Sequence, residues 1–473
     1  MTMQKVAAFD PKAWRGRRVT IMGLGSFGGG TGVTRFFAEL GARVTVTDKA
    51  AHEDLAASLE EIAGLPERLV LGRHDEKDFS EADLVVVSPA VPDSAPMLEV
   101  ARRHGVPLTT EMSLFFQLCP APVIGVTGSN GKSTTAALIG HILAGTGRPT
   151  WLGGNIGRSL LPEWRRIGRE DFVVVELSSF QLEELGRIGR SPHLAVVTNI
   201  SPNHLDRHGT MENYVEAKRQ IVLFQSAGDV AVLNRDDEPT RQFAQCTPGR
   251  VLFFSRNTPC ELGAWQDGML ARFRDRDGSF AVPLGGTKLI GVHNVENMLA
   301  AIATTGTLGV SPEVMAERLV TFEPLPHRLQ PVGEVAGVRY YNDSIATTPD
   351  SVICALAAMD RPIVLIAGGS DKKVSFARLA EAITAKRPPI RKLILLGQTA
   401  DAIAAEVAAR TDRADLIERV RDLSEAVGRA HALARPDDVV LLSPACASYD
   451  QFRNFQQRGD QFARLVAHLS GQQ

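Results

Sequence analysis

The stretch that most constrains this chain is Thr127–Thr134, which reads TGSNGKST. It follows the apolar run 122–126 and precedes the helical pattern 135–143. A strand, a glycine loop, a Lys-Ser pair and a helix together wrap a polyphosphate, because N–H groups of the loop and of the helix N-terminus face the anion. Lys132 would then reach the β- and γ-phosphates, and the Ser133 hydroxyl would bind Mg²⁺. The residues expected to hold ATP in this loop are Gly128, Ser129, Asn130, Gly131, Lys132, Ser133 and Thr134.

The spacing of this loop is unusual. A standard phosphate loop has four residues between its first glycine and the Gly-Lys pair, whereas Gly128 precedes Gly131 here by only two intervening residues. Either the match is accidental or the chain belongs to a family with its own shorter loop. The flanking strand and helix favour the second interpretation.

Composition narrows the class of protein. The 473 residues are too many for one hydrophobic core and predict about three domains. A formal net charge of −2 gives no reason to expect nucleic acid or an anionic membrane as a partner. Five scattered cysteines indicate reduced thiols. The N-terminus lacks the apolar core of a signal peptide, and no apolar run is long enough to span a bilayer. A cytoplasmic enzyme without membrane insertion is therefore expected.

Three segments separate by pattern, and we expect α/β domains at 1–110, 111–325 and 326–473. The first contains a βαβ start typical of a Rossmann-like sheet, with apolar runs at 18–22, 44–48 and 83–88. The second is predicted to be a P-loop ATPase-like, mostly parallel sheet covered on both faces, with runs at 172–175, 194–197, 230–233 and 251–254. The third is expected to be Rossmann-like again, with runs at 362–366, 392–396 and 438–442.

A second glycine motif, Gly23-x-Gly25-x-x-Gly28, follows the first apolar run, and Asp48 comes about twenty residues later. This spacing fits a dinucleotide fingerprint and therefore NAD. The same glycines would also form a tight strand-to-helix turn without a ligand. A third interpretation is a different nucleotide diphosphate bound at the same helix N-terminus.

Polar residues follow several predicted strands. Glu176 ends one of them, where Mg²⁺ is held beside a phosphate loop. His204, Asp206 and His208 crowd the loop after another, a placement that suits a binding loop but also an ordinary solvated one. Lys218, in the helical stretch that follows, is by itself typical of a surface lysine.

Further along the chain, Asn294 could simply cap the helix that follows it. In the third segment, 341–344, 368–372 and 443–452 are polar loops expected to line one edge of a sheet. Loops of this kind often only turn the chain.

Together these motifs resemble the Mur ligases, ATP-dependent amide-forming enzymes of peptidoglycan assembly. Within that family they most resemble the type that adds glutamate to UDP-N-acetylmuramoyl-L-alanine. The resemblance covers essentially the whole chain, with the motifs in the family's order. The motifs are 127–134, 153–157, 176–181, His204-x-Asp206-Arg207, 293–297, His327-Arg328, 342–344 and 441–459.

The resemblance implies a role for each motif. The first glycine turn would hold the UDP of the substrate and no NAD, with Ser26, Phe27, Asp48 and Lys49 nearby. The muramoyl-alanine part would contact Asn155, Ser178 and Gln181. Two Mg²⁺ sites would use Ser133, Glu176, His204 and Lys218, the last as a carbamate formed with CO₂. Adenine and ribose would meet Asn294, Asn297, Arg328 and Asp343. The incoming glutamate would meet Thr347, Lys372, Ser448 and Phe455.

The implied reaction forms an acyl phosphate from ATP and the substrate carboxylate, and D-glutamate then displaces phosphate. Lys132 would be catalytic together with His204 and Lys218, and His204 and the carbamate are both candidates for the general base. The protein is expected to act as a monomer on small-molecule substrates.

Three positions depart from the family pattern. Asn203 stands where an acidic residue often precedes the family histidine, and Gln330 stands where Glu is usual. Ile345 replaces a lysine that many relatives carry. The last change leaves open an L-glutamate-adding ligase, and also a nucleotide-gated binding protein that has lost catalysis.

Individual motifs would also suit two further classes of enzyme. A folylpolyglutamate-synthase-like ligase would share the phosphate loop, but the N-terminal nucleotide-type domain argues against it. An NAD-dependent oxidoreductase would rest on Gly23 to Asp48.

Overall fold

The computed structural model describes residues 9–25, 28–385 and 387–471, without the side chain of Asp206. These residues form three sheets of five, nine and six strands, each mostly or wholly parallel. The α/β fold class predicted from the sequence is thereby confirmed. The chain divides into two compact units, one of residues 1–286 with 296–320 and one of 287–295 with 321–473.

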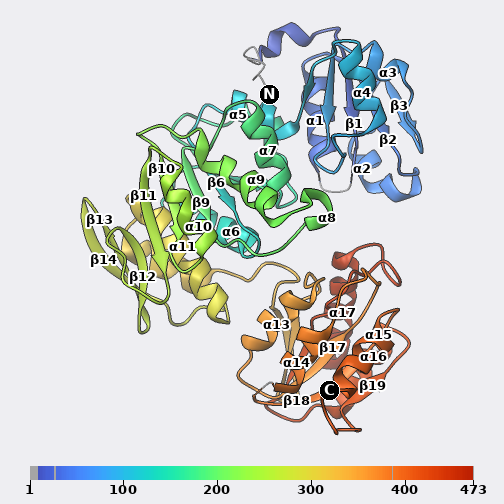
Figure 1. Ribbon diagram of the computed structural model, residues 1–473, viewed down its shortest axis with the longest axis vertical. Coiled ribbons are helices and arrows are strands. Elements are labelled where there is room, and N and C mark those ends of the chain that lie inside the picture. The colour runs from blue at the N-terminus through green and yellow to red at the C-terminus, as the bar shows by residue number, and fades with distance from the viewer. Residues whose placement is uncertain (1–8, 26–27, 386, 472–473) are drawn as a thin grey trace. The chain divides into compact units, whose positions relative to one another are not determined.

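The N-terminal sheet has the strand order β3-β2-β1-β4-β5, and all its pairs are parallel (Figure 1). The order reverses at β1, the switch point at which open α/β sheets bind ligands. Its strands are β1 (Arg18–Met22), β2 (Arg43–Asp48), β3 (Arg68–Leu71), β4 (Leu84–Val87) and β5 (Leu108–Thr109). The helices of this segment are η1 (Pro11–Trp14), α1 (Gly29–Glu39), η2 (Glu53–Leu55), α2 (Ala56–Glu61), α3 (Lys77–Ser80) and α4 (Pro96–Arg103).

The central sheet has the order β14-β13-β12-β11-β10-β9-β6-β8-β7 and contains the phosphate loop after β6. Its strands are β6 (Val123–Thr127), β7 (Thr150–Gly154), β8 (Phe172–Glu176), β9 (Leu194–Val197), β10 (Val230–Asn234), β11 (Arg250–Ser255), β12 (Gly263–Asp267), β13 (Leu270–Asp275) and β14 (Gly278–Pro283). The helices are α5 (Glu111–Leu118), α6 (Lys132–Ala144), η3 (Leu161–Glu163), α7 (Ser179–Arg187), α8 (Leu205–His208), α9 (Met211–Leu223), α10 (Glu238–Gln242), η4 (Phe243–Gln245), α11 (Val292–Thr307) and α12 (Pro312–Thr321).

The inner strands of the central sheet are apolar because helices cover both faces. All residues of β6, β8 and β9 are buried. One hydrophobic core continues from this sheet into the N-terminal one, where Phe36 and Phe37 of α1 belong to the same cluster as Leu160 and Leu161. The strands β12 to β14 form an antiparallel outer edge that the sequence patterns did not predict (Figure 1).

The second unit contains a sheet of order β15-β16-β20-β17-β18-β19, in which β15 and β16 are antiparallel and the other pairs are parallel. Its strands are β15 (Gln330–Val335), β16 (Val338–Asn342), β17 (Ile363–Ala367), β18 (Ile390–Leu395), β19 (Ile417–Arg419) and β20 (Val439–Leu442). The helices are α13 (Pro349–Ala357), α14 (Ala377–Ala385), α15 (Ala400–Ala408), α16 (Leu423–Leu433) and α17 (Phe455–Gly471).

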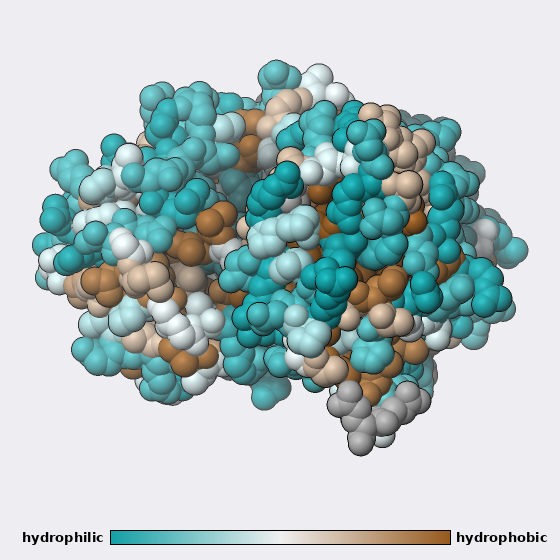
Figure 2. All heavy atoms as spheres, turned by 90° about the horizontal axis from the view of Figure 1, so that it is seen from below, coloured by the Kyte–Doolittle hydropathy of each residue, from teal (hydrophilic) through white to brown (hydrophobic). Residues whose placement is uncertain are grey.

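The surface is mixed in polarity. On the face shown in Figure 2, hydrophobic residues form small patches between hydrophilic ones. Among the described residues, no helix combines the length and the apolar character needed to cross a bilayer.

Candidate active site

The phosphate loop is held in shape by two glycines and by the strand next to it. Gly128 and Gly131 have φ angles of 151° and 80°, and a Cβ at either position would collide with Thr198 Oγ1 or Asn297 Oδ1 respectively. The Ser129 N–H donates to the Asn199 carbonyl at 2.7 Å, and the Asn130 N–H donates to Asn199 Oδ1 at 2.9 Å. Two of the loop amides therefore anchor the loop to the end of β9, and α6 begins directly afterwards at Lys132.

Two lysine side chains donate to carbonyls of this loop. Lys132 Nζ lies 2.9 Å from the Ser129 oxygen, and Lys218 Nζ lies 2.8 Å from the Gly128 oxygen. Lys218 is 1% exposed, so its interpretation as a surface lysine is wrong. Burial, and then the charge of Lys132, lower the pKa of Lys218 well below its ordinary value, although Glu176 opposes the shift. The arrangement favours a neutral amine at this position.

Glu176 ends β8 beside the loop and is 1% exposed. Its Oε1 accepts a 2.8 Å hydrogen bond from Asn155 Nδ2. Its Oε2 is buried and has no hydrogen-bond partner among the described residues. An unpaired buried carboxylate oxygen is costly, and a cation would satisfy it.

The residues around Glu176 fit a magnesium ion with oxygen ligands, because Ser133, at the start of α6, supplies a hydroxyl. The described residues contain no group of three or more His, Cys, Asp or Glu side chains that could hold a metal by themselves. Further oxygen ligands would come from water molecules, from a bound phosphate or from a modified side chain.

The two histidines after β9 have different environments. His204 is exposed, has a φ of 53°, and its ring lies 5.3 Å from the Phe180 ring. His208 is buried against Ser179, whose Oγ lies 3.0 Å from His208 Nε2. Of this pair, only His204 is exposed to solvent.

Arg207, between these histidines, ties the loop to the N-terminal sheet. Its guanidinium lies over the Phe180 ring and donates to the Pro89 carbonyl at 2.6 Å.

The two asparagines of α11 make different contacts. Asn297 Oδ1 accepts a hydrogen bond from Thr135 Oγ1 at 3.1 Å and lies against Gly131 of the phosphate loop. Asn294 lies inside the helix, which begins at Val292, and its amide donates to the Ile290 carbonyl at 2.7 Å. The expectation that Asn294 could cap this helix is therefore wrong.

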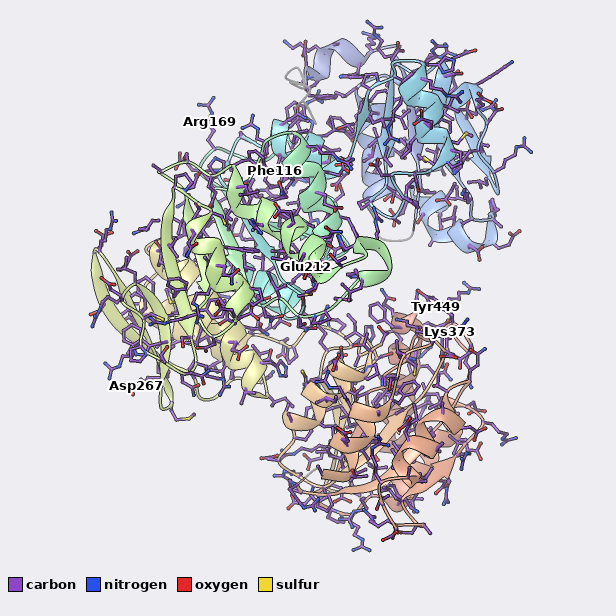
Figure 3. The ribbon with its side chains drawn as sticks, viewed as in Figure 1. Phe116, Arg169, Glu212, Asp267, Lys373 and Tyr449 are labelled. Carbon is purple, nitrogen blue, oxygen red and sulfur yellow. The ribbon has the colours of Figure 1, made fainter. Side chains whose placement is uncertain are left out.

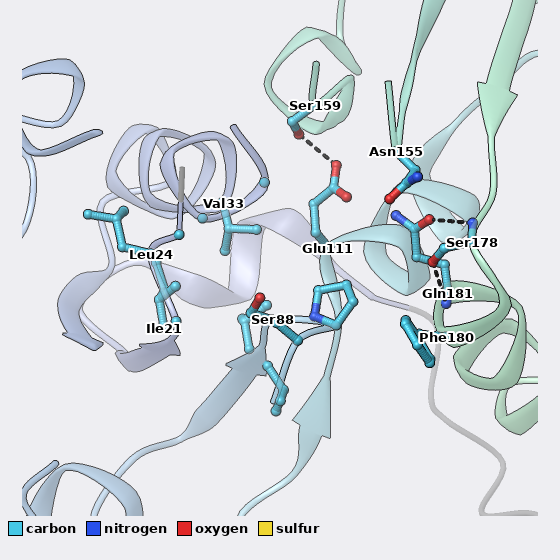
Figure 4. A pocket seen from close by; sticks show the side chains of 18 of the residues that line it. Ile21, Leu24, Val33, Ser88, Glu111, Asn155, Ser159, Ser178, Phe180 and Gln181 are labelled. Atoms are coloured by element: carbon cyan, nitrogen blue, oxygen red, sulfur yellow. Dashed lines mark hydrogen bonds between the residues drawn. The ribbon is translucent and has the colours of Figure 1, made fainter. Parts of the chain in front are cut away.

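A cavity of about 290 Å³ lies between the first glycine turn and the loop 154–159 (Figure 4). Asn155, Ser178 and Gln181, predicted to contact the muramoyl-alanine part, all line it. Ser178 and Gln181 also form a capping box at the start of α7, with bonds of 3.2 and 2.9 Å. Glu111 lines the same cavity and was missed from the sequence.

The residues predicted to lie around the UDP divide into three cases. Asp48 accepts hydrogen bonds from the N–H groups of Leu24 and Gly25 at 2.8 and 3.2 Å. Its carboxylate therefore fixes the glycine turn, whereas in a dinucleotide site it would bind a ribose. Lys49 is exposed. Ser26 and Phe27 lie outside the described residues.

Three of the predicted glutamate-binding residues, Thr347, Lys372 and Ser448, lie on loops at the carboxyl ends of strands of the second unit, and Phe455 is the first residue of α17. Lys372 Nζ lies 3.4 Å from the Thr347 carbonyl, and the Phe455 carbonyl accepts a bond from Ser344 Oγ. Ser448 is buried in the loop after β20. That loop pairs with the one after β17 through Ser370 and Ala447, and Figure 3 shows Tyr449 and Lys373 on these two loops.

Two buried ionisable groups lie beneath these loops. Arg458, 2% exposed, donates to the carbonyls of Ser344 and Cys446 at 2.8 and 3.1 Å, and was missed from the sequence. Burial raises the pKa of Asp343 to about 7, although bonds from Ser443 and Leu329 and the charge of Arg328 oppose the rise.

A phosphate loop at the carboxyl edge of a mostly parallel sheet, with a second glycine turn beside a cavity, defines a phosphate-loop α/β protein with two candidate ligand sites. Three family models match the chain. "Mur ligase MurD-like, N-terminal domain" matches residues 17–110, "Mur ligase middle domain" matches 126–305, and "Mur ligase, glutamate ligase domain" matches 327–446.

Full-length relatives agree with these matches. A protein of Symbiobacterium thermophilum named UDP-N-acetylmuramoylalanine–D-glutamate ligase is 43% identical over 458 residues, which cover 96% of this chain and 98% of the relative. A protein of the same name from Roseiflexus sp. is 42% identical and covers 95% of this chain and 98% of the relative. The chain belongs to the Mur ligase family.

Solved structures support the fold. The UDP-N-acetylmuramate-alanine ligase MurC of Thermotoga maritima matches with a TM-score of 0.65 at 18% identity, over 96% of this chain and 99% of that one. MurF of Acinetobacter baumannii matches with a TM-score of 0.58 at 18% identity, over 98% of this chain and 92% of that one.

Proposed function

We propose that this chain joins D-glutamate to UDP-N-acetylmuramoyl-L-alanine at the expense of ATP, a step of peptidoglycan precursor synthesis. One contact carries this proposal. Asn155 lines the cavity beside the first glycine turn and donates to Glu176, which ends the strand next to the phosphate loop. A carboxylate substrate in the cavity would thus lie next to the triphosphate that activates it.

The reaction follows from this adjacency. The substrate carboxylate attacks the γ-phosphorus of ATP, which gives an acyl phosphate and ADP. The amine of D-glutamate attacks the acyl carbon, a tetrahedral intermediate forms, and inorganic phosphate leaves. Lys132 would swing from the Ser129 carbonyl to the transferring phosphoryl group, where its charge balances the negative charge that develops.

Ser133 and Glu176 would hold Mg²⁺, which when bound neutralises phosphate oxygens. The remaining nucleotide contacts, Asn294, Asn297, Arg328 and Asp343, belong to the same proposal. So do the contacts of the amino acid with Thr347, Lys372, Ser448 and Phe455. His204, exposed at the start of α8, stays a candidate for a second metal site and for the base that deprotonates the amine.

Lys218 is proposed to carry a carbamate. A neutral amine attacks CO₂, and the product is an N-carboxylate and a proton. Its burial and its lowered pKa favour the neutral amine that this chemistry requires. The carbamate would provide an oxygen ligand for Mg²⁺ beside Glu176, which a lysine ammonium cannot do. A ¹³C carbamate signal after incubation with ¹³CO₂, absent from Lys218→Arg, would support the modification, and its absence from the unaltered protein would refute it.

The function is tested by phosphate release. The protein is mixed with ATP, Mg²⁺, UDP-N-acetylmuramoyl-L-alanine and one glutamate enantiomer at a time. Release that depends on D-glutamate is expected. Release with L-glutamate alone would establish the L-glutamate-adding ligase that Ile345 left open, and no release with either enantiomer would refute the ligase.

A further inference from the structure

Glu111 is the only ionisable side chain among the described residues that line the cavity beside the first glycine turn. The other described lining groups are glycines, apolar side chains and uncharged polar ones. Under the proposed function, this cavity receives a ligand with a negative charge on each phosphate and on its terminal carboxylate. A lone acidic residue is an unexpected companion for such a ligand.

The position of Glu111 is fixed by its surroundings. It is the first residue of α5, which Thr110 caps through a 3.2 Å bond from the Ser113 N–H. Ser159 Oγ donates to Glu111 Oε1 at 2.6 Å, and the second carboxyl oxygen is directed into the cavity (Figure 4). Ser159 in turn is packed against α1, where a Cβ at Gly32 would lie 2.6 Å from its side chain. The carboxyl group therefore cannot easily turn away from a ligand.

Burial raises the pKa of Glu111 to about 7, and the hydrogen bond from Ser159 only partly opposes the rise. Charged side chains on the surrounding elements have partners elsewhere or are exposed. Arg35 of α1 bonds the Glu61 carbonyl, and Arg187 of α7 pairs with Asp93 and Glu184. Glu183 of α7 lies near His208, and Arg158 of the loop 154–159 is exposed.

We propose that Glu111 couples binding of the substrate in this cavity to the uptake of one proton, an inference that rests on the proposed function. When the UDP-sugar binds, the carboxylate takes up one proton from solvent and becomes a neutral acid. That acid keeps accepting the bond from Ser159 and donates its own O–H to an oxygen of the substrate. A charged carboxylate at the same place would repel the negatively charged ligand.

The test measures binding of UDP-N-acetylmuramoyl-L-alanine without ATP, by isothermal titration calorimetry in two buffers with different ionisation enthalpies. At pH 8 the unaltered protein should take up close to one proton on binding, and Glu111→Gln should take up none. Between pH 6 and pH 8 the Kd of the unaltered protein should rise by about tenfold, while that of Glu111→Gln stays constant. The amide keeps the acceptor for Ser159 and a donor toward the cavity, so the variant should bind at both pH values.

Glu60→Gln removes an exposed carboxylate from α2 in the same unit and should behave like the unaltered protein. The inference is overturned if the unaltered protein takes up no proton at pH 8, or if Glu111→Gln keeps the pH dependence. It is also overturned if Glu111→Gln binds more weakly at pH 6 and pH 8 alike, because the carboxylate itself would then be the group in contact with the ligand. Absence of binding by the unaltered protein at either pH would instead refute the proposed function, and this inference with it.

Discussion

The glycine turns after β1 and β6 have similar local designs and opposite electrostatic surroundings. At the first, the Asp48 carboxylate accepts from the N–H groups of Leu24 and Gly25, and the adjoining cavity contains no cationic side chain among its described lining residues. At the second, the amino group of Lys132 donates to a carbonyl of the turn itself. A turn that only binds a diphosphate can rely on backbone dipoles. A turn at which a phosphoryl group is transferred needs positive charge that can respond as negative charge develops.

Lys132→Met should give the largest effect. It removes the cation of the second turn and should lower kcat by about 10³-fold, with little change in the affinity for UDP-N-acetylmuramoyl-L-alanine. Steady-state phosphate release and calorimetry check the two quantities, and Lys77→Met, at an exposed position of α3, serves as a control. If the affinity for the UDP-substrate fell by as large a factor as kcat, the two turns would not have the separate roles proposed for them.

Glu176→Gln should give the next largest effect, because this residue connects the two regions through Asn155. The amide keeps the volume of the side chain but removes the negative charge that a magnesium ion requires. The rate should fall by about 10²-fold, and the Mg²⁺ concentration for half-maximal rate should rise. A lower rate with an unchanged Mg²⁺ requirement would mean that Glu176 acts only by positioning Asn155.

The sequence predicted the strands around these turns well, since strands buried on both faces, such as β6, β8 and β9, are continuous apolar runs. It did not predict the edge strands β12 to β14. Their exposed positions carry charged residues such as Arg272 and Arg274, which interrupt the apolar pattern.

The residues of the candidate sites also differ in how well the sequence predicts them. The phosphate loop was predictable because its spacing is local. The burial of Lys218 depends on how α9 packs against that loop, and a glutamate at the first position of a helix, as Glu111 is, usually faces solvent. Arg458 was missed for the same reason, since its partners Ser344 and Cys446 are brought to it by the fold of the second unit.

Asp48→Ala tests the first turn. It leaves the N–H groups of Leu24 and Gly25 without their charged acceptor, and hydrogen bonds to charged groups contribute about 1.5–3 kcal/mol. The Kd for UDP-N-acetylmuramoyl-L-alanine should rise by about tenfold, whereas the KM for ATP should stay the same. A raised KM for ATP would show that the two turns are not independent. Asp10→Ala, which removes the cap of η1, is the matched control and should leave both constants unchanged.

Ser178→Ala should give the smallest effect and separates a structural role from a binding role. Ser178 caps α7 and also lines the cavity. Loss of such a cap costs about 1 kcal/mol of stability, which thermal unfolding would detect as a lower Tm. The matched variant Thr210→Ala removes the cap of α9, a hydroxyl that accepts a 3.2 Å hydrogen bond from the Asn213 N–H. Thr210 is not among the described residues that line the cavity.

If Ser178 acts only as a cap, the two variants should lose similar stability and leave the Kd for the UDP-substrate unchanged. If its hydroxyl also contacts the ligand, Ser178→Ala alone should raise that Kd by a few-fold, in keeping with the about 0.5–1.5 kcal/mol of a neutral hydrogen bond. The prediction that Ser178 contacts the muramoyl-alanine part requires the second result, because a residue committed to its capping box in both the free and the bound state would contribute nothing to affinity.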